Sequence, residues 1–242
     1  MDRTSLKIIV NTIIACLLAT SSFSFLGCGL AARHHNVLGR EAFESGQVSK
    51  AINEFQLALS KDRNNSDAYY NLGATYYTLA KQSRNNQWMD QSEQLLRQSI
   101  ALNPTNVDAH RTLAGLLVES GRSQFALDLL NAWQQRNPFS ADPLVELARL
   151  YQEFGDTPRA TNYLADAMRI DSNNPRVLSA MGHVRERQGQ LAQALENYIR
   201  SYQIDQRQTD VAAKITDLQT RIAGLPYPYN GGTPPQTLQY QR

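Results

Sequence analysis

Side chains with strong binding chemistry recur at matching positions along the chain. Arg40, Arg111 and Arg149 carry planar guanidinium groups, which suit carboxylate or carbonyl oxygens. Tyr70 and Tyr77 offer flat apolar area of the kind enriched at interfaces. An amide and an imidazole complete the set of candidates: Asn71 and His183. These residue types predict recognition of a peptide or protein surface.

Common catalytic and nucleotide-binding motifs are absent from the sequence. It contains no Gly-x-Ser-x-Gly, no phosphate-binding glycine-rich loop, no His-Glu-x-x-His and no calcium-loop pattern. His34 and His35 could bind a metal, but adjacent residues point to different sides of a helix, so we expect them to be exposed. His110 falls at a packing position, and we expect it to be partly buried. We therefore predict that the protein is not an enzyme and has no cofactor or metal site.

A fixed period of small residues defines the elements that must position these side chains. Gly121, Gly155 and Gly189 lie 34 residues apart, and an alanine follows each of them after five residues. Gly46 precedes Gly121 by 75 residues, which is two periods plus seven. Such a period is typical of stacked helix–turn–helix repeats, in which glycine allows a turn with positive φ. The seven extra residues predict one insertion.

The pattern resembles the tetratricopeptide repeat family. The run 69–76 matches the Leu-Gly and aromatic positions of the family's first helix, and Leu113-Ala114 holds the same phase. Pro104 and Pro138, again 34 residues apart, hold its closing proline position. The resemblance covers residues 32–208 and implies an all-α fold, a right-handed α-solenoid of about five repeats with a C-terminal capping helix.

The period divides the chain into five repeats and a cap. The repeats are expected at residues 32–65, 66–106, 107–140, 141–174 and 175–208. The range 209–224 is expected to form the capping helix, because its apolar residues fall on one stripe. Lys214 and Arg221 fall off that stripe and are expected to face water. Residues 226–242 are rich in Pro, Gly and Tyr, which predicts an extended or disordered tail. The tail could also dock on a partner or in the protein's own groove.

The insertion maps to residues 81–90, which are polar apart from Trp88 and Met89. Lengthened turns in solenoids lie on one edge and often carry binding. We therefore expect a longer turn here. Trp88 could be an exposed anchor for a partner, or it could hold the turn against its own repeat.

In this family the first helix of each repeat lines the concave face, so the resemblance implies a binding groove there. By repeat phase the further candidates are Asn36, Phe43, Ala74, Asp108, Gly115, Val145, Gln152, Ser179 and Glu186. Chaperone-binding members hold a C-terminal carboxylate with two lysines, two asparagines and an arginine. Only Asn71 matches that set, and Asp108 would repel a carboxylate. We therefore predict no carboxylate clamp.

The N-terminal residues 1–28 resemble a secretory signal peptide that ends at a lipidated cysteine. Arg3 and Lys7 precede an apolar run, and Phe25-Leu26-Gly27-Cys28 is similar to a bacterial lipobox, although Phe25 replaces the preferred leucine. Lipidation at Cys28 would anchor the protein outside the cytoplasm, with the periplasmic face expected. An uncleaved signal anchor and simple secretion remain the alternatives. Cys28 follows only one other cysteine, so no disulfide framework is expected.

Charge and repeat architecture together favour a protein-binding scaffold. After Cys28 the chain has 22 Lys and Arg against 21 Asp and Glu, which argues against nucleic acid as a partner. We predict a non-enzymatic adaptor that binds a protein or peptide in its groove at the cell envelope, without a small-molecule substrate. The alternative is a structural or oligomerising subunit of an envelope assembly complex that uses its convex face or its tail.

Overall fold

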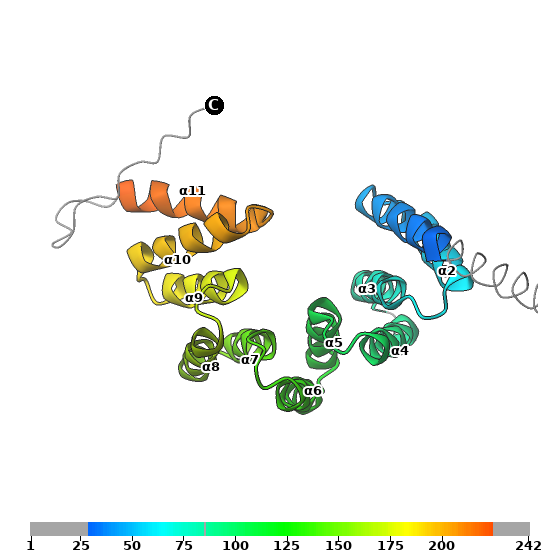
Figure 1. The fold of residues 1–242 in the computed structure, drawn as a ribbon, viewed down its shortest axis with the longest axis horizontal. Coiled ribbons are helices and arrows are strands. Elements are labelled where there is room, and N and C mark those ends of the chain that lie inside the picture. Colours follow the sequence, from blue (N-terminus) through cyan, green and yellow to red (C-terminus); the bar gives the residue numbers. More distant parts are fainter. Residues whose placement is uncertain (1–28, 85, 225–242) are drawn as a thin grey trace, which may run out of the picture. The chain divides into compact units, whose positions relative to one another are not determined.

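The computed structural model describes residues 29–84 and 86–224, and all regular structure in these ranges is helical (Figure 1). The predicted all-α fold is confirmed. The chain divides into two compact units, Met1–Pro138 and Phe139–Arg242, a division that the repeat period did not predict. We call them unit 1 and unit 2.

Both units are built from consecutive helix pairs. In unit 1, residues 29–44 are helical and are followed by α2 (Val48–Lys61), α3 (Ser66–Ser83), α4 (Asn86–Leu102), α5 (Val107–Glu119) and α6 (Ser123–Arg136). In unit 2, the helices are α7 (Asp142–Glu153), α8 (Thr157–Ile170), α9 (Pro175–Arg187), α10 (Leu191–Ile204) and the single helix α11 (Thr209–Ala223).

Glycines with left-handed backbone form the turns within four of the pairs. The φ angles lie between 73° and 79° at Gly46, Gly121, Gly155 and Gly189, as the sequence predicted. In each turn the N–H of the next residue donates to a carbonyl oxygen five residues earlier. At Gly121 this bond joins Arg122 N–H to the Leu117 oxygen at 2.7 Å. Such a bond ends a helix by satisfying a carbonyl that the helix leaves open.

The turns between pairs depend on asparagine and aspartate side chains. A side-chain oxygen accepts the N–H two residues later at Asp62, Asn103, Asp171 and Asp205. In three of these turns, the residue three positions later caps the next helix with its side-chain oxygen. The capping residues are Asn65, Asn106 and Asn174. These bonds replace backbone partners that a helix start lacks. The repeat pattern predicted only prolines at the ends of the pairs.

Large side chains pack directly over small residues inside the pairs. A Cβ added to Gly39 would lie 2.4 Å from the Phe55 ring, and one added to Gly182 would lie 2.7 Å from the Tyr198 ring. The alanines five residues after the turn glycines are fully buried. Small residues at these phases therefore let the paired helices approach closely.

The insertion lengthens two helices, and the prediction of a longer turn was wrong. Residues 81–83 belong to α3, Arg84 lies in the left-handed region at φ 53°, and α4 begins at Asn86. Trp88 is therefore a helical residue, and it is half-buried. The helical form satisfies the added backbone groups internally, which an irregular turn would leave to solvent.

No helix within residues 29–84 and 86–224 is both long and apolar enough to cross a membrane. The predicted signal peptide with Cys28 and the tail at 226–242 lie outside these ranges.

The turn geometry can be tested with Gly121→Ala. We expect the free energy of unfolding to fall by roughly 1–2 kcal/mol, because a Cβ in the left-handed region crowds the following carbonyl oxygen. The measurement is urea unfolding followed by circular dichroism. Gly115→Ala is the control. Its Cβ would lie 3.4 Å from the Tyr77 hydroxyl, and alanine favours a helix interior, so stability should not fall. Equal stability of Gly121→Ala and the wild type would contradict the left-handed turn.

Candidate functional site

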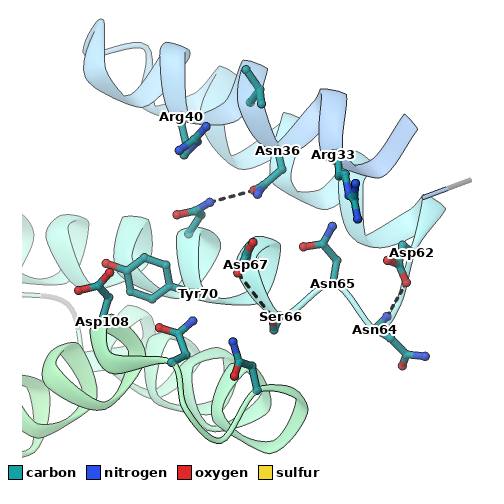
Figure 2. A pocket seen from close by; sticks show the side chains of 14 residues that line it. Arg33, Asn36, Arg40, Asp62, Asn64, Asn65, Ser66, Asp67, Tyr70 and Asp108 are labelled. Atoms are coloured by element: carbon teal, nitrogen blue, oxygen red, sulfur yellow. Dashed lines mark hydrogen bonds between the residues drawn. The ribbon is translucent and has the colours of Figure 1, made fainter. Parts of the chain in front are cut away.

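Unit 1 contains a hollow of about 810 Å³ between the helix of residues 29–44, α3 and the start of α5. Its lining consists of Arg33, Asn36, Val37, Arg40, Asp62, Asn64, Asn65, Ser66, Asp67, Tyr70, Asn71, Asn103, Asn106 and Asp108. Figure 2 shows these side chains around the open space. The lining is almost entirely polar, and six of its members are asparagines.

The charges of the hollow are separated by element. Arg33 and Arg40 extend from the helix of residues 29–44 toward α3 (Figure 2). Asp62 lies in the turn before α3, Asp67 lies on α3 and Asp108 lies on α5. Among the described residues, neither Arg33 nor Arg40 has a hydrogen-bond or ion-pair partner. The positive groups are therefore available to a ligand.

The asparagines combine structural bonds with spare hydrogen-bonding capacity. Asn71 Nδ2 donates to Asn36 Oδ1 at 2.9 Å, which links the helix of residues 29–44 to α3. Asn65 and Asn106 use their side-chain oxygens as helix caps. A primary amide has two N–H donors and an oxygen with two acceptor positions, so these bonds leave groups unused. An amide can therefore bind the C=O and N–H groups of an extended peptide.

Tyr70 contributes a neutral hydroxyl to this polar surface. Burial raises the pKa of Tyr70 above its usual value, and the negative charge of Asp108 raises it further. Hence the hydroxyl remains protonated at neutral pH and can donate a hydrogen bond.

The structure brings five of the predicted binding residues together. The hollow is lined by Asn36, Arg40, Tyr70, Asn71 and Asp108. Tyr77 and Arg111 belong to unit 1 but are outside the lining. The Tyr77 ring lies 5.3 Å from Lys81 Nζ, and Arg111 forms an ion pair with Asp108 at 3.5 Å.

Other lining residues had not been considered for binding, among them Arg33, Asn65, Asn103 and Asn106. The recurrence of Asp or Asn before each repeat could have indicated the last three. Arg33 lies 13 residues before its turn glycine Gly46, as Asp108 does before Gly121, so the repeat phase that selected Asp108 could have indicated it.

Arg149 lies in unit 2, and its guanidinium is already engaged there. Its Nε donates to Glu146 at 3.0 Å, and Nη1 donates to Glu153. Glu146 is fully buried and also binds Arg176 at 2.8 Å. Because a buried carboxylate without cationic partners is costly, Arg149 has a structural role. Of the three arginines predicted to bind a partner, Arg149 is therefore already used inside the protein.

His183 also lies in unit 2, near the charged residues Asp210 and Lys214 of the capping helix α11. Burial lowers the pKa of His183, and the positive charge of Lys214 lowers it further, so the ring is neutral at pH 7. The ring meets the Tyr198 ring edge-on, with 5.3 Å between centroids. This contact gives His183 a packing role.

Glu186 connects the capping helix α11 to α9. It accepts from Lys214 at 3.1 Å, from Arg221 at 2.9 Å and from Tyr198 at 3.0 Å. The expectation that Lys214 and Arg221 face only water was wrong, because both reach this half-buried carboxylate. The apolar stripe of α11 is packed as predicted, with Val211 and Leu218 buried.

The remaining histidines make local contacts. His35 is half-buried, although the sequence predicted an exposed residue, because its Nδ1 lies 2.7 Å from Glu54 Oε2. The ring of His110 stacks on Trp133 with 4.0 Å between centroids. His110 is buried rather than half-buried. In the described ranges no group of three potential ligands could hold a metal ion.

Helix pairs joined by glycine turns and stacked in sequence define a class of α-helical repeat proteins. Residues 39–79 match the family described as TPR repeat, and residues 89–144 match the family described as Tetratricopeptide repeat. The chain therefore contains tetratricopeptide repeats over these residues.

Three known proteins illustrate the likeness. TTC0263 of Thermus thermophilus is 19% identical with a TM-score of 0.59, covering 78% of this chain and 100% of its own. The pilF protein of Pseudomonas aeruginosa is 16% identical with a TM-score of 0.51, and the match covers 81% of this chain and 92% of the pilF chain. A BBSome complex member BBS4 homolog of Drosophila melanogaster is 24% identical over 166 residues, which is 66% of this chain. The chain spans about a third of that relative's length, 34%. These likenesses show the fold.

The role of Glu186 predicts a pH-dependent loss of stability in unit 2. Partial burial alone would raise the pKa of Glu186, but bonds from Lys214, Tyr198 and Arg221 outweigh it, and the pKa lies below the usual value. A lowered carboxyl pKa contributes stability above the unfolded-state pKa, and this contribution is lost as pH falls through the folded-state pKa.

Glu186→Gln should therefore reduce the free energy of unfolding at pH 7 by about 1 kcal/mol. The difference from the wild type should shrink as the pH falls toward 3. Urea unfolding at several pH values measures it, with the exposed Glu196→Gln on α10 as the control. A difference that stays constant with pH would refute the assigned ion pairs.

Proposed function

We propose that the hollow of unit 1 binds an extended segment of a partner protein and that the chain acts as a non-enzymatic adaptor. Tetratricopeptide repeat proteins generally mediate protein–protein interactions, which supports this role. The observation that supports binding in this hollow is its polar lining, where Arg33 and Arg40 lack partners among the described residues.

The lining favours main-chain recognition. An extended segment exposes N–H and C=O groups along both edges, and the side-chain amides of Asn36, Asn65 and Asn106 can bind either group. Tyr70 adds a ring and a protonated hydroxyl. The corresponding first helices of unit 2 use their charged groups for internal ion pairs, as at Arg149 and Glu186. We therefore place the binding site in unit 1.

We further propose that the adaptor is held at the cell envelope by lipidation of Cys28. The support is the sequence of residues 1–28, with its positive start, its apolar run and the lipobox-like end. Two or more acyl chains would suffice for stable anchoring, because each buried methylene contributes about 0.8 kcal/mol.

Site-specific photocrosslinking in the native host can test the binding face. A photoreactive residue at Val37, which lines the hollow and is 41% exposed, should form an adduct with the partner. Arg40→Ala should weaken that adduct, because it removes an unpaired guanidinium. The control is the same probe at Arg169 on α8, whose side chain is 77% exposed. Adducts from position 169 alone would overturn the site and favour the alternative of a structural subunit with another interface.

Metabolic labelling with palmitate can test the anchor. The wild-type protein should incorporate the label and fractionate with membranes, whereas Cys28→Ser should lose the label because no thiol remains at the lipobox. Cys16→Ser is the matched control and should retain it. Membrane association of unlabelled wild-type protein would instead support an uncleaved signal anchor.

A further inference from the structure

We infer that the hollow of unit 1 selects an extended segment in which acidic and basic side chains alternate. This inference rests on the proposed function and names the chemistry of the segment. Its basis is the opposition of two arginines on one helix to three aspartates on the facing elements.

The positive side of the hollow has a defined length. Arg33 and Arg40 are seven residues apart, so they lie on one face of the same helix. A rise of 1.5 Å per residue separates them by about 10 Å along the axis. Side chains on one edge of an extended chain are two residues apart, about 6.6 Å, and the long, flexible arginine side chains can cover the remaining distance. The charged part of the recognised segment is therefore short, about three to five residues.

The negative side is maintained by the fold. Asp67 and Asp108 stand in the first turns of α3 and α5, where the helix dipole favours a negative charge. Asp62 stands in the preceding turn and accepts the N–H of Asn64 at 2.9 Å. Asp108 keeps 59% of its side chain exposed although Arg111 lies 3.5 Å away. These carboxylates can therefore bind a cationic side chain of a ligand.

The two sides do not neutralise each other. Within the described residues, no ion pair joins Arg33 or Arg40 to the three aspartates. In unit 2, by contrast, Arg176 lies 3.6 Å from Asp142 and 2.8 Å from Glu146. The hollow therefore presents opposite charges that remain open to a ligand.

Alternating side chains match this arrangement because successive residues of an extended chain point to opposite sides. Acidic side chains on one edge would meet Arg33 and Arg40, and basic side chains on the other edge would meet the aspartates. A purely acidic segment would be repelled by three carboxylates, and a purely basic one by two guanidinium groups. The segment's main chain would run between them, within reach of the asparagine amides.

Fluorescence anisotropy with four capped eight-residue peptides can test the inference. The peptides alternate Glu with Lys, Glu with Ser, Lys with Ser, and Gln with Ser, with acetylated and amidated ends to remove terminal charges. We expect the Glu-Lys peptide to bind at least tenfold more tightly than each of the others, with an affinity that falls as salt rises.

Charge reversal provides a readout that a misfolded variant could not give. Arg33→Glu with Arg40→Glu should make the Lys-Ser peptide the preferred ligand. Asp67→Lys with Asp108→Lys should make the Glu-Ser peptide preferred. Arg169→Glu on α8 should leave the order unchanged.

Separate outcomes apply to the two proposals. Equal binding of all four peptides, unaffected by the reversals, would overturn the charge pattern and leave the peptide-binding hollow standing. If the Val37 crosslink forms but none of the four peptides binds, the charge pattern is likewise overturned and the peptide-binding hollow stands. Failure of both the peptides and the crosslink would overturn the proposed function as well.

Discussion

The close contact between a large side chain and a glycine inside several helix pairs is the constraint on which this fold depends. Phe55 and Tyr198 occupy the space that a Cβ on Gly39 or Gly182 would need. This approach lets a pair of short helices bury apolar area that neither could bury alone. Since each pair has an apolar surface left over, the pairs must stack on their neighbours within a unit. The first-helix side chains then face away from that contact and are free to diversify.

Diversification has taken opposite directions in the two units. In unit 2 the first-helix positions hold Glu146 and Arg149, whose ion pairs satisfy each other internally. At the equivalent phases of unit 1 the chain places Val37, Asn71 and Arg40, which leave an open hollow. Repeats with the same backbone can therefore differ in function, because a few polar residues decide whether the first-helix face is filled by its own side chains or left for a ligand.

The periodic features of the fold could be predicted from sequence because they depend on residue types with unusual backbone or size. Gly121 and its equivalents adopt the left-handed turn that the period indicated. Polar side chains were harder to place, because the partner of a charged residue depends on tertiary contacts. Arg149 had the same phase as Arg40 but a different environment. The insertion was misjudged because polar composition indicated a turn, whereas its residues are compatible with longer helices.

The asparagines join stability and recognition in the same turns. Asn65 and Asn106 cap α3 and α5 with their side-chain oxygens, and the same residues line the hollow. The requirement for a cap restricts these positions to short polar residues, since only these reach the free N–H groups of the first turn. A polar rim on the hollow therefore arises from the turns that join the pairs. Selectivity for a ligand then depends on residues that no turn constrains, chiefly Arg33 and Arg40. These arginines face the starts of the capped helices, so the hollow has its positive and negative charges on separate sides.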